Sequence, residues 1–282
     1  MNLVIQSLDP IADTHLKPLT ALARTHGKQS ERADAGRVLR LSGADPLQRP
    51  DIDAYCGTHR LDYAFIDPAL RLSDFGLVAM DMDSTLITIE CIDEIADFCG
   101  LKAEVAAITE ASMRGEIKDF NESLTRRVAL LKGLDASALE RVYEERLRLS
   151  PGAEIMLAGA KAAGLKTLLV SGGFTFFTEK LKARLGLDFT RANTLEIVDG
   201  KLTGKVSGEI VNADVKARTL RETCTQLGID PQRSIAMGDG SNDLKMMAEA
   251  GLSVAFRAKP VVREAAGLAL NFVGLDGLLR LF

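Results

Sequence analysis

The residues most suited to chemistry are two aspartates, Asp81 and Asp83, which stand one residue apart directly after the apolar run LVAM at 77–80. A carboxylate held at the end of a strand can attack phosphorus and form an aspartyl-phosphate, because carboxylates serve as nucleophiles in covalent catalysis. The second carboxylate, two residues further on, can protonate the leaving oxygen and then activate water. We therefore predict phosphoryl transfer, with Asp81 as nucleophile and Asp83 as acid and base.

Three later stretches contain the other groups that such a reaction needs. Ser171 and Gly172, in the stretch SGG, offer a hydroxyl and unhindered backbone N–H groups for phosphate oxygens, and Lys216 adds a fixed positive charge. Asp239 and Asp243, in GDGSND, are placed to join the first aspartate around Mg²⁺, which prefers oxygen ligands. Without a cation these acids would raise one another's pKa, so the acidic cluster implies the metal.

Each motif also has an ordinary structural interpretation. An isolated Asp-x-Asp is commonly a turn or a helix cap, SGG is commonly a turn, and GDGSND lacks the spaced acids of a calcium-binding loop. Lys216 alone would be a solvated surface charge. The order of the motifs, with each polar stretch following its own apolar run, favours the catalytic interpretation.

Composition limits the classes of partner and compartment. The chain has 282 residues, 46% hydrophobic and 26% charged, with a formal net charge of −4 and no long basic run, so we expect a small-molecule substrate and no nucleic-acid partner. No segment resembles a signal peptide or a membrane span, and the four cysteines show no metal-site or disulfide spacing. We therefore predict a cytoplasmic protein without a membrane partner.

The pattern of elements predicts an α/β fold. Apolar runs before the three polar stretches alternate with helix-like segments, which indicates a parallel sheet with its ligand crevice at the carboxyl ends of the strands. Residues 90–149 break this alternation with successive helices, and we interpret them as a cap that closes over the site. Residues 1–74 form a small α+β unit before the catalytic domain at 75–282, and Asp199-Gly200 is predicted as a tight hairpin turn.

With these motifs in this order, the chain resembles the haloacid dehalogenase (HAD) superfamily of phosphohydrolases, through DMDST, SGG, Lys216 and GDGSND. The resemblance implies a Rossmann-like parallel sheet with a helical cap. It also implies that Mg²⁺ is held by the Asp81 carboxylate, the Asp83 backbone carbonyl and Asp239, with Asp243 in support.

Within that superfamily the stretches DMDSTLITIECIDEIAD, SLTRRVALLKG and GDGSNDLKMMAEAG are similar to the phosphoserine phosphatase family. This resemblance implies hydrolysis of L-phosphoserine, the last step of serine biosynthesis. Glu90 would then meet the substrate's ammonium group and Arg127 its carboxylate. The residues implied to hold phosphate are Ser171, Gly172, Lys216 and Asn242.

Several alternatives stay open at this level. Only one of the adjacent Arg126 and Arg127 can face inward, because neighbours on a helix point about 100° apart. Met113 and Phe120 either wall the substrate pocket or are ordinary core residues. The substrate could instead be a related phosphomonoester such as phosphohomoserine, or the chain could sense serine without turnover. The first 74 residues loosely resemble ACT-like regulatory domains, and packing or assembly of a homodimer are equal alternatives for them.

Overall fold

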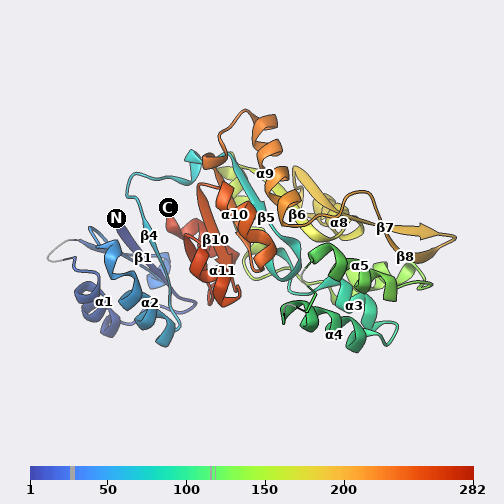
Figure 1. The fold of residues 1–282 in the computed structure, drawn as a ribbon. Coiled ribbons are helices and arrows are strands. Elements are labelled where there is room, and N and C mark those ends of the chain that lie inside the picture. The colour runs from blue at the N-terminus through green and yellow to red at the C-terminus, as the bar shows by residue number, and fades with distance from the viewer. Residues whose placement is uncertain (26–28, 115, 118) are drawn as a thin grey trace.

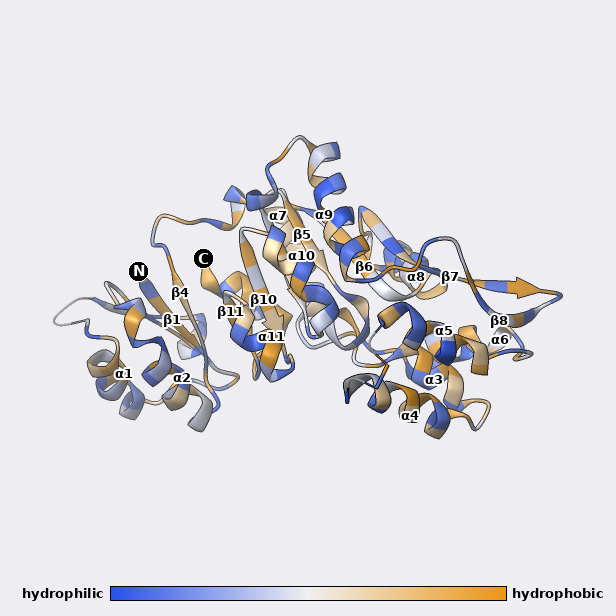
Figure 2. Ribbon diagram, viewed as in Figure 1, coloured by the Kyte–Doolittle hydropathy of each residue, from blue (hydrophilic) through white to orange (hydrophobic). Residues whose placement is uncertain are grey.

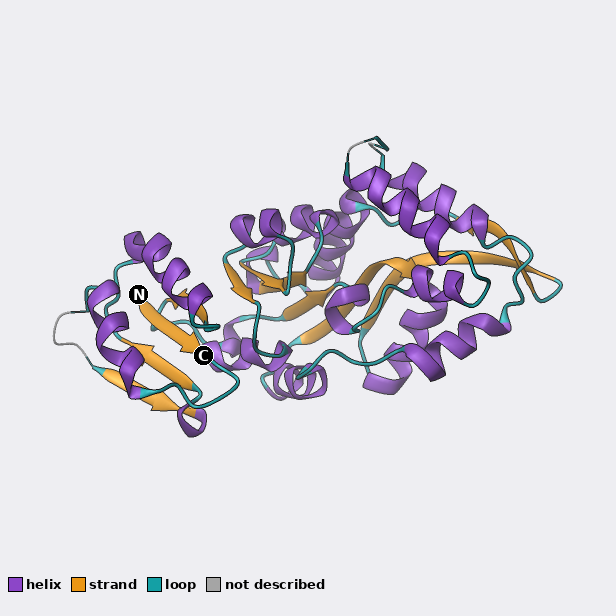
Figure 3. Cartoon of the chain, turned by 90° about the horizontal axis from the view of Figure 1, so that it is seen from below, coloured by secondary structure: helices purple, strands orange, loops and turns teal. Residues whose placement is uncertain are grey.

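The computed structural model describes residues 1–25, 29–114, 116–117 and 119–282, in which the strands form one eleven-stranded sheet in the order β2-β3-β1-β4-β11-β10-β9-β5-β6-β7-β8. Figure 3 shows this sheet running the length of the molecule, with helices on both sides. The strands are β1 (Asn2–Gln6), β2 (Ser30–Ala33), β3 (Val38–Leu41), β4 (Asp62–Ile66), β5 (Leu77–Met80), β6 (Lys166–Phe174), β7 (Phe189–Val198), β8 (Lys201–Ser207), β9 (Ser234–Gly238), β10 (Leu252–Phe256) and β11 (Leu268–Leu270).

The N-terminal part folds as β1-α1-β2-β3-α2-β4, with α1 at Leu16–Leu22 and α2 at Arg49–Thr58. Its four strands are antiparallel in the order β2-β3-β1-β4, which is the split β-α-β arrangement of ferredoxin-like domains. Leu3, Ile52 and Phe65 belong to a separate hydrophobic core beneath the helices. Every residue of this unit's core is therefore supplied by the first 66 residues.

The central part of the sheet is parallel. β5 pairs in parallel with β9 on one side and with β6 on the other, so the three strands that precede the predicted motifs are direct neighbours. Figure 2 shows hydrophobic residues along β5 and β10 and a mainly hydrophilic α9 on the outside. The helices that cover this part are α7 (Ala153–Ala162), α8 (Thr175–Leu185), α9 (Ala213–Leu227), α10 (Leu244–Glu249) and α11 (Pro260–Ala265). The α/β class with a parallel-rich sheet is confirmed.

Besides α7, four helices of the described residues lie between β5 and β6 in the chain, and they form a group of their own (Figures 1 and 2): α3 (Cys91–Asp97), α4 (Lys102–Met113), α5 (Phe120–Leu130) and α6 (Ser137–Arg141). An antiparallel bridge between Ile87 and Leu149 joins the two ends of this segment. Leu202 of β8 donates its N–H to the Leu134 oxygen at 2.8 Å, so the far end rests on the β7–β8 hairpin. We refer to residues 90–149 as the cap.

The β7–β8 hairpin turns at Asp199 and Gly200, whose φ angles are 49° and 75°. Two successive positive φ angles make a type I′ turn, the geometry that suits the twist of a two-residue hairpin. The hairpin prediction is confirmed. By contrast the SGG stretch, predicted as a turn, forms the last part of β6, where the pairing with β7 shifts register between Val170 and Phe174.

The N-terminal unit and the catalytic part share the sheet, because β4 pairs with β11 at Tyr63 and Ala269. The buried Asp62 carboxylate accepts three successive backbone N–H groups, from Asn271 at 2.7 Å and from Phe272 and Val273 at 2.9 Å each. Gln6 and Arg40 also donate side-chain hydrogen bonds across the junction, to the Gly277 oxygen and to the oxygens of residues 280–282, so backbone pairing and several side chains join the two units. None of the helices in the described residues is long and apolar enough to cross a membrane.

Candidate active site

The turn after β5 is held in place by backbone hydrogen bonds on both sides. All four residues of β5 are buried, and the turn Met82–Leu86 that follows has Ser84 at a φ of 55°. Ile87 donates its N–H to the Met82 oxygen at 3.0 Å, and Ser84 donates its own to the Ile89 oxygen at 3.2 Å. The positive φ at Ser84 reverses the chain, so that Asp81 and Asp83 both stay at the sheet edge.

Lys216 is completely buried and contacts two carboxylates. Its Nζ lies 2.7 Å from an oxygen of Asp81 and 2.7 Å from one of Asp243. Burial alone would lower the pKa of Lys216, but the charges of Asp243 and Asp81 outweigh it and raise the pKa. The lysine comes from the first turn of α9, where Asn212 caps the helix by accepting the N–H groups of Asp214 and Val215. The cation is therefore fixed beneath the first aspartate.

Three carboxylates lie close enough to share a cation. Asp81, Asp239 and Asp243 each offer one oxygen, and these oxygens lie within 4.8 Å of one another. Burial raises the pKa of Asp239 to about 6 and that of Asp243 to about 7, and the charge of Asp81 adds to both shifts. Thr85 donates its hydroxyl to Asp239 at 3.2 Å. An all-oxygen set of buried and half-buried acids fits a hard divalent cation, which would replace the protons that the raised pKa values retain.

Asp83 lies beside the triad but in a different environment. Its carboxyl accepts the Cys91 N–H at 3.4 Å, and burial, followed by the charges of Glu90 and Asp81, raises its pKa well above the ordinary value. Gly173 faces it closely, since a Cβ there would lie 2.9 Å from an Asp83 oxygen. The protonated form is therefore favoured, as a proton donor requires.

The end of β6 supplies an anion cradle. The Ser171 hydroxyl accepts the Gly173 N–H at 2.9 Å, which fixes the hydroxyl at the strand end. Asn193 of β7 donates its side-chain N–H to the Gly172 oxygen at 2.7 Å and accepts the Val211 N–H at 2.8 Å. Asn193 is buried and was not singled out in the sequence, where nothing distinguishes it from other asparagines. It holds the backbone of the cradle from behind.

A cavity of about 370 Å³ opens above these groups, between the strand ends and the cap. From the strand ends it is lined by Asp81, Asp83, Ser171, Gly172, Asp239 and Asn242, and from the cap by Glu90, Asp93, Phe120 and Arg127. The predicted residues thus come together around one cavity, with Lys216 directly beneath Asp81. Met113 is the last residue of α4, and its side chain lies outside the described residues.

Glu90 and Arg127 stand on the cap wall of the cavity. Ser84 donates its hydroxyl to Glu90 at 2.7 Å. Loss of solvent around the carboxyl group, together with the negative charges of Asp239 and Asp81, raises the pKa of Glu90 to about 7. The hydrogen bond from Ser84 acts in the opposite direction and lowers it. Arg127 donates its Nε to the Ser123 oxygen at 3.4 Å, whereas its neighbour Arg126 is exposed and pairs with Glu122. The structure therefore places Arg127, and not Arg126, on the cavity.

Two charged residues that line the cavity were not predicted from the sequence, although each had a recognisable signal there. Lys259 follows the apolar strand β10, so the rule that found the other strand ends applies to it as well. Asp93 lies three residues after Glu90, on the same face of α3. Burial lowers the pKa of the Arg127 guanidinium, and the negative charge of Asp93 partly opposes that shift. Asp93 and Arg127 therefore interact electrostatically.

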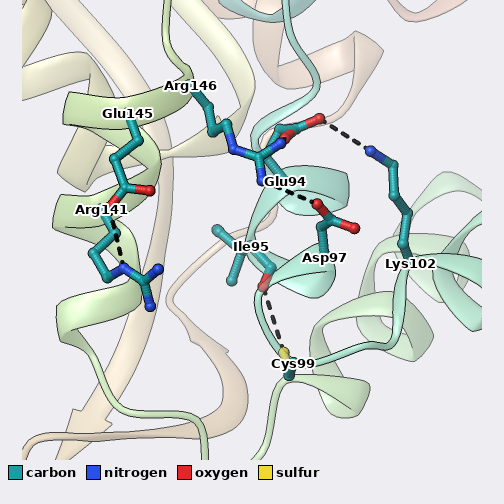
Figure 4. A network of polar contacts seen from close by, with 8 residues as sticks. All are labelled: Glu94, Ile95, Asp97, Cys99, Lys102, Arg141, Glu145 and Arg146. Carbon is teal, nitrogen blue, oxygen red and sulfur yellow. Dashed lines mark hydrogen bonds and ion pairs between the residues drawn. The ribbon is translucent and has the colours of Figure 1, made fainter.

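The cap is held together by ion pairs on its outer side (Figure 4). Arg146 pairs with Glu94 at 3.2 Å and with Asp97 at 3.3 Å, and Glu94 also pairs with Lys102 at 3.2 Å. Arg146 and Arg141 both lie over the ring of Phe98. These contacts fix α3, the helix that begins directly after Glu90, against α4 and the segment that leads back to the sheet.

Comparison with known proteins agrees with this geometry. The profile of the haloacid dehalogenase-like hydrolase family matches residues 78–248, and that of a domain of unknown function (DUF4072) matches residues 3–52. The chain belongs to the haloacid dehalogenase-like hydrolase family. Phosphatases of this family are metal-dependent, and the triad of Asp81, Asp239 and Asp243 could bind the metal ion.

Particular relatives are similar over most of their length. A phosphoserine phosphatase of a Polaromonas species is 61% identical over 218 residues, which cover 76% of this chain and 92% of the relative. Among solved structures, a HAD family hydrolase of Salmonella enterica serovar Typhi has a TM-score of 0.89 at 35% identity, covering 99% of this chain and 97% of the other. A probable phosphoserine phosphatase of Vibrio cholerae has a TM-score of 0.83 at 38% identity, covering 99% and 85%.

Proposed function

We propose that the chain is a phosphoserine phosphatase, which hydrolyses L-phosphoserine to L-serine and phosphate with Mg²⁺ as cofactor. One observation carries the proposal: a single cavity has a nucleophile, an acid and an anion cradle on its floor, and an acid and an arginine on its cap wall. The floor suits a phosphate and the wall suits the two charges of an amino acid. The names of the similar proteins support the same substrate.

In the first half of the proposed reaction, the phosphate lies against Ser171, the Gly172 N–H and Asn242. A carboxylate oxygen of Asp81 attacks phosphorus while Asp83 gives its proton to the oxygen of the leaving serine. The P–O bond to serine breaks, and an aspartyl-phosphate forms on Asp81. Lys216, 2.7 Å from Asp81, adds positive charge below the phosphoryl group.

In the second half, Asp83 is a carboxylate and takes a proton from water. The water oxygen attacks phosphorus, the bond to Asp81 breaks, and phosphate leaves with Asp83 protonated again. Mg²⁺, held by Asp81, the Asp83 backbone carbonyl and Asp239 with Asp243 in support, would neutralise the phosphoryl oxygens. The raised pKa of Asp83 suits the first half, in which it must start as an acid.

Substrate identity depends on the cap in this proposal. Glu90 binds the ammonium group, and Arg127 binds the carboxylate, since its planar fork can form two parallel hydrogen bonds to a carboxylate. Both lie on the cap wall opposite the phosphate cradle.

The decisive experiment measures phosphate release with Mg²⁺ from three substrates: L-phosphoserine, phosphohomoserine and phosphoethanolamine. Phosphoethanolamine is phosphoserine without its carboxylate. We expect kcat/KM to be highest for L-phosphoserine and to fall about 100-fold for phosphoethanolamine, since a charged bidentate contact is lost. Equal values for these two would remove the role of Arg127, and a higher value for phosphohomoserine would reassign the substrate.

Two further proposals concern the cellular location of the protein and its oligomeric state. All four cysteines lie within the described residues and are free thiols, as the reducing cytoplasm favours. We keep the cytoplasm as the proposed location and a homodimer as the proposed assembly.

A further inference from the structure

Asn193 of β7 lies behind the anion cradle and is only 2% exposed. In the pairing of β7 with β6, Val170 lies opposite Arg191, and Phe174 lies opposite Asn193. Three residues of β6, 171–173, therefore lie opposite a single residue of β7. Such a bulge takes the backbone out of the regular ladder, so the peptide groups of 171–173 need other hydrogen-bond partners.

The side-chain amide of Asn193 supplies one of these partners. Its Nδ2 donates to the Gly172 oxygen at 2.7 Å, and its Oδ1 accepts the N–H of the buried Val211 at 2.8 Å. The opposite orientation of the amide would set its oxygen against the Gly172 oxygen and its NH₂ group against the Val211 N–H. Only one orientation of the side chain therefore satisfies both neighbours.

The peptide group between Gly172 and Gly173 is held on both sides. Asn193 binds its carbonyl oxygen, and the Ser171 hydroxyl oxygen accepts its N–H, which is that of Gly173, at 2.9 Å. The C=O and the N–H of one trans peptide point in opposite directions. Turning this peptide over would therefore break both hydrogen bonds at once.

Two adjacent glycines offer little resistance of their own to such a rotation, because glycine adopts positive and negative φ angles about equally. Larger residues could not supply the restraint. A Cβ at Gly172 would lie 3.0 Å from the Phe120 ring, and a Cβ at Gly173 would lie 2.7 Å from the Met82 side chain. The close approach of these side chains requires glycine, so the carbonyl is restrained by the hydrogen bond from Asn193.

This restraint decides what Ser171 can offer to a phosphate. Ser171 lines the catalytic cavity, and because its oxygen already accepts the Gly173 N–H, its own proton can be donated into the cavity. If the peptide turned over, the Gly172 oxygen would replace that N–H on the side of Ser171. A carbonyl oxygen would then compete with phosphate for the hydroxyl proton and repel the anion.

The second hydrogen bond of Asn193 extends to the helix that carries Lys216. Val211 directly precedes Asn212, the N-cap of α9, and Lys216 lies in the first turn of that helix. One side-chain amide therefore joins the strand that forms the anion cradle to the helix that supplies the buried cation.

We propose that Asn193 is a positioning residue for the phosphoryl group: it prevents the Gly172–Gly173 peptide from turning over and so keeps the Ser171 hydroxyl a donor to phosphate. It acts through backbone groups and not by contact with the reacting atoms. The role rests on the proposed phosphatase reaction, but it concerns the phosphate alone and is the same for any phosphomonoester.

The binding test measures the affinity of the full chain, with Mg²⁺ present, for inorganic phosphate by calorimetry. Asn193→Ala should weaken phosphate binding about tenfold or more, the value of one hydrogen bond to a charged group. Asn193→Leu has nearly the volume of asparagine but no amide, so it should show the same loss, and it replaces the alanine variant if that chain does not fold.

Ser234→Ala is the matched control. It also removes a buried side-chain hydrogen bond to a backbone oxygen, from Ser234 to Pro231 at 2.6 Å, but at the start of β9, the end of the strand opposite Asp239. Phosphate affinity should stay unchanged in this variant. An unchanged affinity in Asn193→Ala and Asn193→Leu as well would overturn the proposal.

A double-mutant cycle separates positioning from a general loss of structure. Ser171→Ala removes the hydroxyl through which Asn193 is proposed to act. The loss of phosphate affinity in the double variant with Asn193→Ala should therefore be smaller than the product of the two single losses. Single losses that multiply would mean that Asn193 does not act through Ser171, and would overturn the proposal.

Turnover provides a further measurement. Asn193→Ala should reduce kcat/KM for L-phosphoserine and for phosphoethanolamine by the same factor, because both present the same phosphate to the cradle. A loss confined to L-phosphoserine would assign Asn193 to the amino-acid end of the substrate and overturn the proposal. If L-phosphoserine proves not to be the substrate, phosphate binding still tests Asn193, so the two proposals can fail separately.

Discussion

The floor of the catalytic cavity and the outer side of the cap hold their charges in opposite ways. On the floor, Lys216 has no exposed side-chain surface and lies in direct contact with Asp81 and Asp243. In the cap, Arg146 is 43% exposed and is shared between Glu94 and Asp97 at longer distances. Buried charges are costly unless they are fully paired, whereas exposed pairs contribute little and can rearrange. In the proposed function, the phosphoryl-transfer chemistry belongs to this buried floor, and the choice of substrate belongs to the cap, whose outer ion pairs are exposed.

The cap is attached to the sheet at both of its ends. It begins and ends near the bridge between Ile87 and Leu149, beside the turn that carries Asp83, and its far end is hydrogen-bonded to the β7–β8 hairpin. Five substitutions or conditions, given from the largest expected effect to the smallest, test the contrast.

Asp81→Asn should reduce kcat by roughly 10⁴-fold or more, because the amide cannot form the aspartyl-phosphate. Asn has nearly the same shape as Asp, so the thermal midpoint should stay close to that of the parent chain. Phosphate release and thermal unfolding are measured on the same preparation. Substantial phosphatase activity in a folded Asp81→Asn chain would exclude the proposed mechanism.

Lys216→Met should lower the free energy of unfolding by about 3–5 kcal/mol, because it leaves two buried carboxylates without their cation. Urea unfolding measures this loss. Lys245→Met is the matched control, since Lys245 pairs with Asp214 where both side chains are more than half exposed. The control should cost less than about 1 kcal/mol. Equal losses of unfolding free energy in the two variants would show that a buried ion pair in the floor contributes no more to stability than an exposed one.

Arg127→Ala should reduce kcat/KM for L-phosphoserine about 100-fold and leave the value for phosphoethanolamine unchanged, because only the first substrate has a carboxylate to lose. Arg126→Ala changes the adjacent residue, whose partner is Glu122 on the surface. We expect less than about twofold change in that variant. The reverse ranking would mean that the cap turns the other arginine inward.

Divalent-ion affinity should fall about tenfold or more when the pH is lowered from about 7.5 to about 5.5, because the ion must displace the protons of Asp239 and Asp243. Their pKa values are raised to about 6 and about 7. Without metal, a raised acid binds more protons in the folded than in the unfolded chain, so its contribution to stability declines as pH rises from about 4 to about 7. Mg²⁺ titrations and metal-free unfolding at several pH values check both trends. A pH-independent affinity would contradict the assignment of this triad.

Arg146→Ala should cost less than about 1 kcal/mol of unfolding free energy and change KM less than about twofold, because its pairs are exposed to solvent. Glu145→Ala, which removes only the partner of Arg141, serves as the control. A loss as large as that of Lys216→Met would mean that the cap is as rigid as the floor.

The floor was predictable from the sequence and several other features were not. The strands that precede Asp81 and Asp239 are short apolar runs that end in polar residues. Parallel strands are buried on both faces, so they can be recognised in the sequence as such continuous apolar runs. β2 was missed because its sequence, SERA, has no apolar residue to bury except a half-buried alanine. The choice between Arg126 and Arg127 depends on the rotation of α5, which is set by packing against β8. The pairing of β4 with β11 joins residues more than 200 positions apart, and no local pattern encodes it.

The carboxylate of Asp62 has a consequence for how the molecule unfolds. It accepts hydrogen bonds from the backbone N–H groups of residues 271–273, and Asp62 is only 1% exposed. Separating the N-terminal unit would break three hydrogen bonds at once, which leaves the carboxyl group and three backbone N–H groups without their partners. Neither unit can therefore melt without changing the stability of the other, and the split β-α-β unit and the catalytic sheet behave as one cooperative block in heat.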